Sequence, residues 1–294
     1  MVRRTVCAAA EVPELVTNAR YRESRARRLG ALATTALVAE AELTPKPGLV
    51  DRRGSGAHLD MSVDVLLRSA RAIEPAFIEM GRVAFGVSPG AGLRERLAHI
   101  GRSAELDMLR ATSGVNAHRG AIWALGLLVA GAATGEEHAP VRRVAETAGA
   151  IACFADRFAP QASSHGRRAR ARYGAGGAAG EARSAFPHVV DVGLPALRAA
   201  VARGSDENVA RVDALVAIIA KLGDTCLLHR GGQKALSGAQ SGARAVVAAG
   251  GISARRGWLA FERLERQLLS ANASPGGSAD LLAATLFLSF LERL

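Results

Sequence analysis

Apolar residues recur at helical spacing through most of the sequence, and this period constrains the fold more than any other feature. In the first such run, Leu29, Leu32, Ala33 and Ala36 fall on one helix face. No segment shows the sustained apolar–polar alternation of a half-buried strand. The sequence therefore predicts an all-α fold of about ten helices. The expected helices are Arg25–Leu43, Val63–Met80, Leu93–Ala111, Ala121–Ala133, Val141–Arg157, Val190–Arg203, Asn208–Leu222, Gln233–Ala249, Ser253–Ser270 and Ser278–Leu294.

The length of 294 residues is enough to bury a full hydrophobic core. Residues 1–24 mix charge with Pro13 and show no clear period, so we expect a loose N-terminal lead-in. Residues 25–294 then form a single all-helical domain, with its active site in the segments between helices.

A net charge of +11 raises the possibility of a nucleic-acid partner, but the composition argues against one. Only three of the 38 basic residues are lysine, and the arginines are scattered, which is typical of a genome-wide bias. Aromatic residues make up only 4%, too few for a base-stacking platform. An anionic small molecule fits the charge equally well.

The cysteines and the N-terminus indicate a cytoplasmic protein. Cys7, Cys153 and Cys226 are far apart and odd in number, which is typical of a reducing compartment and not of a disulfide scaffold. No signal peptide is visible. The longest uncharged apolar run, Ala121–Ala133, is too short for the roughly 20 residues that cross a bilayer, so no membrane partner is expected.

The least helical stretch is Thr44–Met61. Pro45 and Pro47 remove backbone donors and disfavour helix, and long aperiodic loops within a compact chain are often functional. Charges of both signs in a stiffened loop suit a metal and an anion held together. A solvated surface loop is the alternative.

Five inter-helix segments share one plan, in which small and polar residues precede a helix. They are Thr44–Met61, Thr112–Gly120, Ser163–Pro187, Gly223–Gly232 and Ser274–Asp280. Helix starts offer unpaired N–H groups and a positive dipole end, which attract phosphate. Many carboxylates with few histidines favour Mg²⁺ over zinc. Taken singly, each histidine is more readily a structural hydrogen-bonding group and each carboxylate a helix cap.

The same segments carry motifs that resemble one family. They are Glu40-x-x-x-Thr-Pro-Lys-Pro-Gly-Leu-Val-Asp51, Gly56-Ala-His-x-Asp-Met61, Gly114-Val-Asn-x-His-Arg-Gly-Ala-Ile122, Ser164-His-Gly166, Gly180-Glu-Ala182 with Phe186-Pro187, Asp224-Thr-x-x-Leu-His-Arg-Gly-Gly232 and Ser274-Pro-Gly-Gly-Ser-Ala-Asp-Leu-Leu282. In order from about residue 30 onward, they resemble the triphosphoribosyl-dephospho-CoA synthase family. Trp123 and the Asp224-Thr-Cys226 variant resemble the branch that serves malonate decarboxylase, with the citrate lyase branch as the near alternative.

The resemblance implies an all-helical enzyme with ATP and 3′-dephospho-CoA as substrates. The ribose 2′-hydroxyl of dephospho-CoA attacks C1′ of the ATP ribose, and adenine leaves. The product is the precursor of a prosthetic group that is passed on toward an acyl carrier subunit. Whether the chain forms a homo-oligomer is left open.

Motif membership and chemical type assign expected roles. The catalytic carboxylates are Glu40, Glu105 and Asp224, and the ligands of Mg²⁺ are Asp60, Glu105 and Asp224. The triphosphate is expected to contact Lys46, Arg119, Arg230, Gly231, Gly232, Ser274, Gly276 and Gly277. Substrate is oriented by His58, Asn116, His118, His165 and His229. The choice of general base among the carboxylates stays open.

Three positions depart from the family pattern. Ala117 and Ala179 stand where Thr and Arg are frequent, and Ser289 replaces an acidic residue. A hydroxyl, a cation and a carboxylate are therefore missing, and no role is assigned to these positions.

Two other functions fit the composition. In a Mg²⁺-dependent all-α N-glycoside hydrolase, water would replace the acceptor hydroxyl, so adenine release would not require dephospho-CoA. A basic nucleic-acid-binding helical protein would bind strands with a steep salt dependence. Ordered site motifs and scarce aromatic residues make this last reading the weakest.

Overall fold

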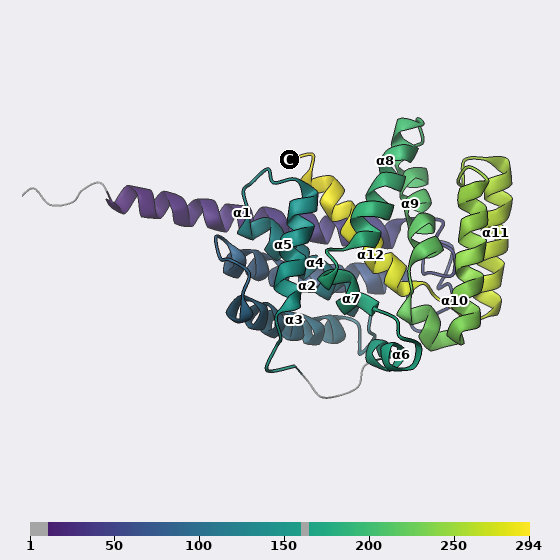
Figure 1. Cartoon of the computed structure of the whole chain (residues 1–294), viewed down its shortest axis with the longest axis horizontal. Coiled ribbons are helices and arrows are strands. Elements are labelled where there is room, and N and C mark those ends of the chain that lie inside the picture. Colours follow the sequence, from purple (N-terminus) through teal and green to yellow (C-terminus); the bar gives the residue numbers. More distant parts are fainter. Residues whose placement is uncertain (1–10, 160–164) are drawn as a thin grey trace, which may run out of the picture.

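Two helices without a polar face lie at the centre of the molecule. The computed structural model describes residues 11–159 and 165–294. Within them, α4 (Arg119–Thr134) and α12 (Gly276–Leu291) are buried along most of their length. A helix that is apolar all round needs neighbours on every side. Figure 1 shows both helices in the middle of the molecule, surrounded by the others.

The surrounding elements are all helical. They are α1 (Glu11–Glu42), α2 (Val63–Ala84), α3 (Ala91–Ala111), α5 (Val141–Cys153), α6 (His165–Tyr173), α7 (Gly177–Arg183), the π-helical turn η1 (Val189–Gly193), α8 (Leu194–Ala202), α9 (Glu207–Lys221), α10 (Thr225–Ala248) and α11 (Arg255–Ser270). The described residues contain twelve α-helices and no strand, which confirms the predicted all-α fold.

Close helix crossings hold the outer helices against this centre. Helices α1 and α2 pack along one another, and α1 also packs against α12. At the first crossing, a Cβ on Gly30 would lie 2.4 Å from Cγ1 of Ile78, so only glycine lets the backbones approach this closely. Side chains such as Phe77 and Leu125 are fully buried in one connected apolar core. Each such burial stabilises the fold by about 1.5–3 kcal/mol.

The predicted lead-in is partly wrong, because α1 begins at Glu11. Pro13 lies in the first turn of this helix, where a missing N–H removes no intrahelical bond. Figure 1 shows the first part of α1 extending beyond the other helices. A helix segment without neighbours needs no apolar stripe, so periodicity could not reveal it. Residues 1–10 lie outside the described part of the chain.

Two predicted irregular segments contain helices. The segment Ser163–Pro187 includes α6 and α7, which are too short and too polar to show an apolar period. The segment Gly223–Gly232 is mostly the start of α10, and Gly232 alone departs from helical geometry, with φ 62° and ψ −160°. This residue kinks α10, so that its first two turns run in a different direction from the rest.

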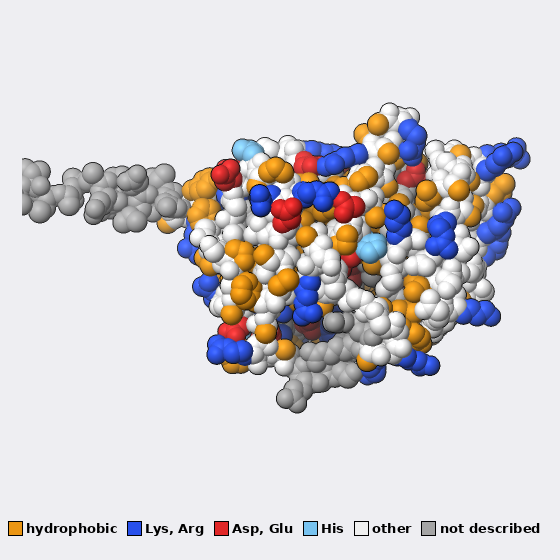
Figure 2. Space-filling view, in the orientation of Figure 1, with side chains coloured by type: hydrophobic (Ala, Val, Ile, Leu, Met, Phe, Trp, Pro, Cys, Tyr) orange, Lys and Arg blue, Asp and Glu red, His pale blue; other side chains and the backbone are white. Residues whose placement is uncertain are grey.

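The surface and the helix lengths give two further observations. On the face in Figure 2, Lys and Arg side chains lie among acidic and apolar ones over the left and middle of the molecule, whereas the charged side chains seen at the right end are basic. Among the described helices, none combines the length and the apolar character that crossing a bilayer requires.

Candidate active site

A cavity of about 470 Å³ lies where several helix ends meet. This volume is in the usual range for small-molecule sites. Its walls come from the end of α1, the loop between α1 and α2, and the starts of α4, α10 and α12. The predicted site residues that line it are Glu40, Lys46, His58, Asp60, Asn116, His118, Arg119, His229, Arg230, Ser274 and Gly276. The structure thus brings together four of the five predicted segments.

Three helix N-termini face this cavity. Arg119 and Gly120 begin α4, Thr225 and Cys226 begin α10, and Gly276 begins α12. Each N-terminus carries a partial positive charge, and three together favour a polyanionic ligand. Arginine side chains at the cavity add full positive charges.

Asp224 ties two of these helix starts together. One carboxylate oxygen accepts the N–H of Cys226 at 2.8 Å, and the other accepts the N–H and the hydroxyl of Ser278 at 2.8 and 2.9 Å. The side chain is buried and does not line the cavity. The structure therefore gives Asp224 the role of a shared helix cap for α10 and α12, in place of the predicted contact with substrate or metal.

Asp280 lines the cavity and had no predicted role. A Cβ on Gly120 would lie 1.9 Å from Oδ2 of Asp280, so glycine at position 120 leaves room for this carboxyl group. The backbone N–H of Ala121 donates to it. Burial, and then the nearby charges of Glu40 and Asp224, raise the pKa of Asp280 well above its usual value. The sequence signal that could have identified Asp280 as a site residue is its position at the end of the Ser274–Asp280 motif.

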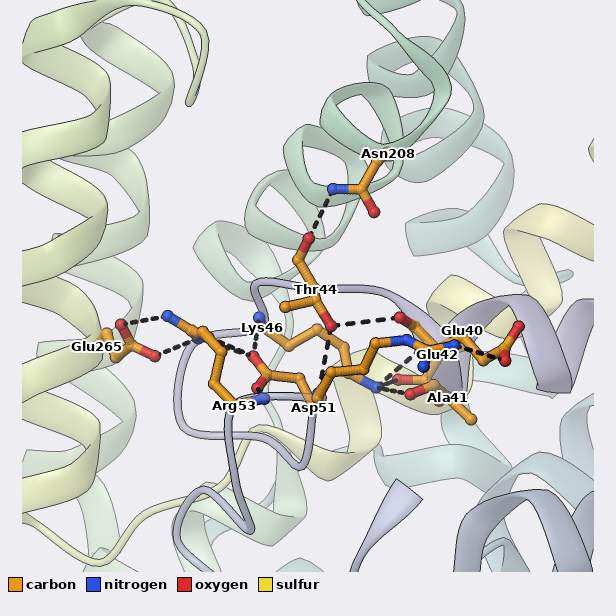
Figure 3. Close-up of polar contacts among 10 residues, drawn as sticks. Glu40, Ala41, Glu42, Thr44, Lys46, Asp51, Arg53, Asn208 and Glu265 are labelled. Atoms are coloured by element: carbon orange, nitrogen blue, oxygen red, sulfur yellow. Dashed lines mark hydrogen bonds and ion pairs between the residues drawn. The ribbon is translucent and has the colours of Figure 1, made fainter. Parts of the chain in front are cut away.

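Lys46 lines the cavity, but its ammonium group is paired with protein oxygens and is not free to act as the predicted triphosphate clamp. Its side chain is 1% exposed, and its Nζ donates to a carboxylate oxygen of Glu40 at 2.8 Å and to the carbonyl of Glu40 at 2.7 Å. The carbonyl of Ala41 lies 3.4 Å away. Figure 3 shows these contacts at the end of α1. In this arrangement, the ammonium caps the last turn of α1 and fixes the Glu40 carboxylate at the cavity wall.

The loop that carries Lys46 is fastened from several directions. Asp51 is buried and accepts the backbone N–H of Lys46 at 2.9 Å. Arg53 pairs with Asp51 and also with Glu265 on α11. Asn208 of α9 donates to the carbonyl of Thr44 at 2.6 Å (Figure 3). The predicted stiff loop is thus held by side chains from two distant helices.

Arg230, His58 and Ser274 form a directional hydrogen-bond chain. Nη2 of Arg230 lies 3.0 Å from Nδ1 of His58, and Nε2 of His58 lies 2.9 Å from Oγ of Ser274. An arginine only donates, so Nδ1 must accept and Nε2–H must donate to Ser274. Burial, and then the charge of Arg230, lower the pKa of His58, which keeps this imidazole neutral.

His118 also lines the cavity and is 4% exposed. Its Nδ1 lies 2.7 Å from Oγ of Ser69 on α2, and its Nε2 has no hydrogen-bond partner among the described residues. Burial, and then the charge of Lys46, lower the pKa of His118 to about 4. At neutral pH this imidazole is therefore uncharged.

Glu105 stands behind the cavity wall. Its carboxylate lies 2.9 Å from Nε of Arg119, and it does not line the cavity. Asn116 accepts the backbone N–H of Arg119 at 3.3 Å. The predicted catalytic role of Glu105 therefore has no geometric support, because this residue reaches the cavity only through Arg119.

The remaining predicted residues fall into three groups. Asp60, His229 and Gly276 line the cavity. Gly231 and Gly232 lie at the kink of α10, and Gly277 donates to Asp224 at 3.3 Å, so none of these three presents a free backbone surface to the cavity. His165 begins α6, and its side chain lies outside the described part of the structure.

The comparisons with known proteins agree with the motifs at this cavity. The chain matches the ATP:dephospho-CoA triphosphoribosyl transferase family over residues 26–294. The chain belongs to this family. It is 52% identical to the probable 2-(5''-triphosphoribosyl)-3'-dephosphocoenzyme-A synthase of Azotobacter vinelandii, over 93% of this chain and 94% of the relative. No solved structure matches it.

A second relative supports the same assignment. The chain is 46% identical to the 2-(5''-triphosphoribosyl)-3'-dephosphocoenzyme-A synthase of Klebsiella pneumoniae, over 91% of this chain and 96% of the relative. Membership of the triphosphoribosyl transferase family makes the protein a transferase, as the motifs predicted.

The three departures from the family pattern lie in different places. Ala117 lines the cavity, so a missing hydroxyl there would face a ligand. Ala179 lies in α7, which does not line the cavity. Ser289 is buried near the far end of α12, about two and a half turns from Asp280. Of the three, only Ala117 can affect binding directly.

Proposed function

We propose that this chain transfers the triphosphoribosyl group of ATP to the ribose 2′-hydroxyl of 3′-dephospho-CoA and releases adenine. The supporting observation is a cavity, built from the triphosphoribosyl transferase motifs, that joins three helix N-termini and arginines to two nearby carboxylates, Glu40 and Asp280. The positive groups suit the triphosphate, and the carboxylates suit the sugar.

The reaction forms a bond from the 2′-oxygen to C1′ and breaks the bond from C1′ to N9 of adenine. Positive charge develops on the sugar as adenine leaves, and carboxylates stabilise it. Lys46 holds the Glu40 carboxylate in place for this role. The raised pKa of Asp280 strengthens its carboxylate as a base, so Asp280 takes the proton of the attacking hydroxyl. The proton finally leaves on adenine, which completes the balance.

The triphosphate lies toward Arg119 and Arg230. Arg230 is already oriented by its bond of 2.7 Å to the carbonyl of Ala57 and by His58. Arg119 is oriented by Glu105. Both arginines keep their charge throughout the reaction, so they contribute chiefly to ATP binding and not to the chemical step.

The cavity also fits one Mg²⁺ ion bound together with ATP. No group of three or more His, Cys, Asp or Glu side chains within the described residues forms a metal site, so the predicted set of Asp60, Glu105 and Asp224 is not assembled. Mg²⁺ in nucleotide sites commonly uses one or two carboxylates plus phosphate oxygens. Asp60 fits this role, because it lines the cavity and makes no hydrogen bond or ion pair with another described residue. Bound there, the ion would neutralise phosphate charge.

The product serves malonate decarboxylase in this proposal and is passed on to its acyl carrier subunit. The branch markers Thr225 and Cys226 line the cavity, and Trp123 lies one turn beyond Arg119 on α4. Deleting the gene of this chain in its host, and then measuring malonate decarboxylase and citrate lyase activity, tests the branch. Loss of citrate lyase activity with malonate decarboxylase activity retained would contradict it.

One assay tests the reaction. The protein is incubated with ATP, Mg²⁺ and dephospho-CoA, and adenine and the enlarged nucleotide are measured by mass. Omitting dephospho-CoA should reduce adenine release to background. Undiminished release with free ribose triphosphate would assign the protein to the hydrolases. Replacing dephospho-CoA by CoA should lower the rate strongly, because the 3′-phosphate adds bulk and charge beside the attacking hydroxyl.

A further inference from the structure

The unpaired nitrogen of His118 is the least explained polar atom at the cavity. Nε2 is buried and has no hydrogen-bond partner among the described residues, and the residue as a whole is only 4% exposed. A buried polar atom without a hydrogen bond costs about 1–3 kcal/mol. Because His118 lines the cavity, a ligand that fills the cavity can satisfy this atom.

The neighbouring serine determines what Nε2 can offer. Ser69 is fully buried on α2, and its hydroxyl has only Nδ1 of His118 as a described hydrogen-bond partner. If Nδ1 carried the proton, the serine hydroxyl proton would have no acceptor. The satisfied arrangement has Ser69 donating to Nδ1, which places the imidazole proton on Nε2. His118 therefore carries an unpaired N–H donor within the wall of the cavity.

The wall beside His118 is apolar. Val50 and Leu66 are buried in a small cluster against which Met61 and Ala117 pack, and all four line the cavity. Leu66 and Ser69 lie one turn apart on α2. A neutral donor next to apolar side chains suits a flat, uncharged heterocycle, whereas phosphates suit the arginines and helix N-termini of the cavity.

We propose that the apolar wall of Val50, Met61, Leu66 and Ala117 is the adenine subsite, and that His118 Nε2–H donates to a ring nitrogen of that adenine. The inference rests on the proposed function and assigns the leaving group to one wall. Negative charge develops on the purine as the bond from C1′ to N9 breaks, and a donor on the ring stabilises it. Ser69 is a positioning residue, because it acts by keeping the proton on Nε2.

The test pairs protein atoms with substrate atoms. Rates of the wild type and of His118→Phe are measured with ATP and with its 1-deaza, 3-deaza and 7-deaza analogues. His118→Phe should lower kcat with ATP by about 10–100-fold. One analogue should lower the kcat of the wild type by about as much as His118→Phe lowers it with ATP. The same analogue should lower the kcat of His118→Phe little below its value with ATP, and the nitrogen missing from this analogue is then the acceptor. Equal penalties in both proteins for all three analogues would overturn the contact.

Two variants separate the contact from folding. His118→Gln keeps a donor near the position of Nε2 and should recover much of the rate with ATP. The recovery should be lost with the analogue that lacks the acceptor nitrogen, whereas for a merely structural histidine it would not depend on the analogue. Ser69→Ala keeps the imidazole and should lower kcat more than it raises the KM for ATP. His138→Phe, at an exposed histidine outside the cavity, is the matched control and should leave rates unchanged.

A spectroscopic measurement tests the tautomer without activity. In ¹⁵N-histidine-labelled protein, the signal absent from His118→Gln should show the Nε2–H tautomer and should not titrate between pH 5.5 and 8.5, since its pKa is lowered to about 4. An Nδ1–H tautomer would overturn the proposal. If the wild type forms no product at all, the proposed function fails. If the wild type forms product, but each deaza analogue slows the wild type and His118→Phe by the same factor, only this assignment fails.

Discussion

Nη2 of Arg230 lies 3.0 Å from Nδ1 of His58, although 172 residues separate them in the chain. The contact joins α10 to the loop after α1 and orients both side chains at the cavity. It also explains the tautomer of His58, because arginine cannot accept a hydrogen bond. The pair therefore couples a cation at the cavity to the loop that carries Lys46.

We expect Arg230→Lys to raise the KM for ATP by about tenfold or more with a smaller change in kcat, because lysine lacks the planar fork that contacts Ala57 and His58 together. The loss of this close guanidinium should also raise the pKa of His58 in Arg230→Met, since Arg230 lowers it in the wild type. Steady-state kinetics and histidine NMR measure the two effects. Arg256→Lys, on the exposed side of α11, is the control. A lower kcat at unchanged KM would contradict a binding role.

Lys46→Met should destabilise the protein by about 3–5 kcal/mol, because it leaves the Glu40 carboxylate buried without its partner. Urea unfolding measures this loss. The double variant Glu40→Leu with Lys46→Met should recover much of the stability but remain inactive. Lys234→Met, at an exposed lysine, should unfold like the wild type. If Lys46→Met raised only the KM for ATP, the lysine would be a clamp after all.

Asp224→Asn should chiefly lower the stability of the protein, whereas Asp280→Asn should chiefly lower its activity. In Asp224→Asn, an amide group would face the N–H of Ser278, so we expect about 1–3 kcal/mol of lost stability. In Asp280→Asn, kcat should fall by roughly 10²–10⁴, because a general base is removed. Paired unfolding and kinetic measurements on both variants distinguish the cap from the base.

The pH dependence of stability provides a separate check on Asp280. Its pKa is raised in the folded protein, so the folded state retains the proton to higher pH than the unfolded state does. The free energy of unfolding of the wild type should therefore fall as pH rises from the unfolded pKa of about 3.9 toward the folded pKa. Asp280→Asn lacks this fall, so its stability relative to the wild type should increase with pH. A constant difference between pH 4 and pH 8 would contradict the raised pKa.

Gly120→Ala should lower kcat nearly as much as Asp280→Asn, because the new Cβ would displace the carboxyl group of Asp280 from a position 1.9 Å away. Gly92→Ala is the matched control, since Gly92 lies in α3 with open space around it. The control should gain stability by up to about 1 kcal/mol through helix propensity. Wild-type rates in Gly120→Ala would show that the position of Asp280 is not critical.

Removal of Mg²⁺ by a chelator should abolish adenine release if the ion accompanies ATP. Asp60→Asn should then require more Mg²⁺ for half-maximal rate, and high Mg²⁺ should restore much of the activity. Glu105→Gln should show no such rescue, because Glu105 contacts Arg119 and not the cavity. Equal Mg²⁺ requirements in Asp60→Asn and the wild type would remove Asp60 from the metal site.

The helical period predicted the fold class, since buried stripes on α2 or α9 leave a clear trace in the sequence. The motifs predicted most of the cavity wall. They could not predict which polar groups face the ligand. Lys46 and Asp224 looked like ligand contacts because of their charge, but tertiary packing turned them toward Glu40 and toward helix ends. Ser69 lies outside every motif, and only its distance to His118 reveals it.

The contacts that close the cavity join segments that are far apart in the chain, and this has a consequence for the order of folding. His58 and Ser274 are 216 residues apart, and Arg53 and Glu265 are 212 apart. Contacts at such separation form slowly, because the intervening loop must first lose its entropy. During refolding, far-ultraviolet circular dichroism should therefore recover before enzymatic activity does. Partly folded chains would carry most of the helices while still lacking a place for substrate.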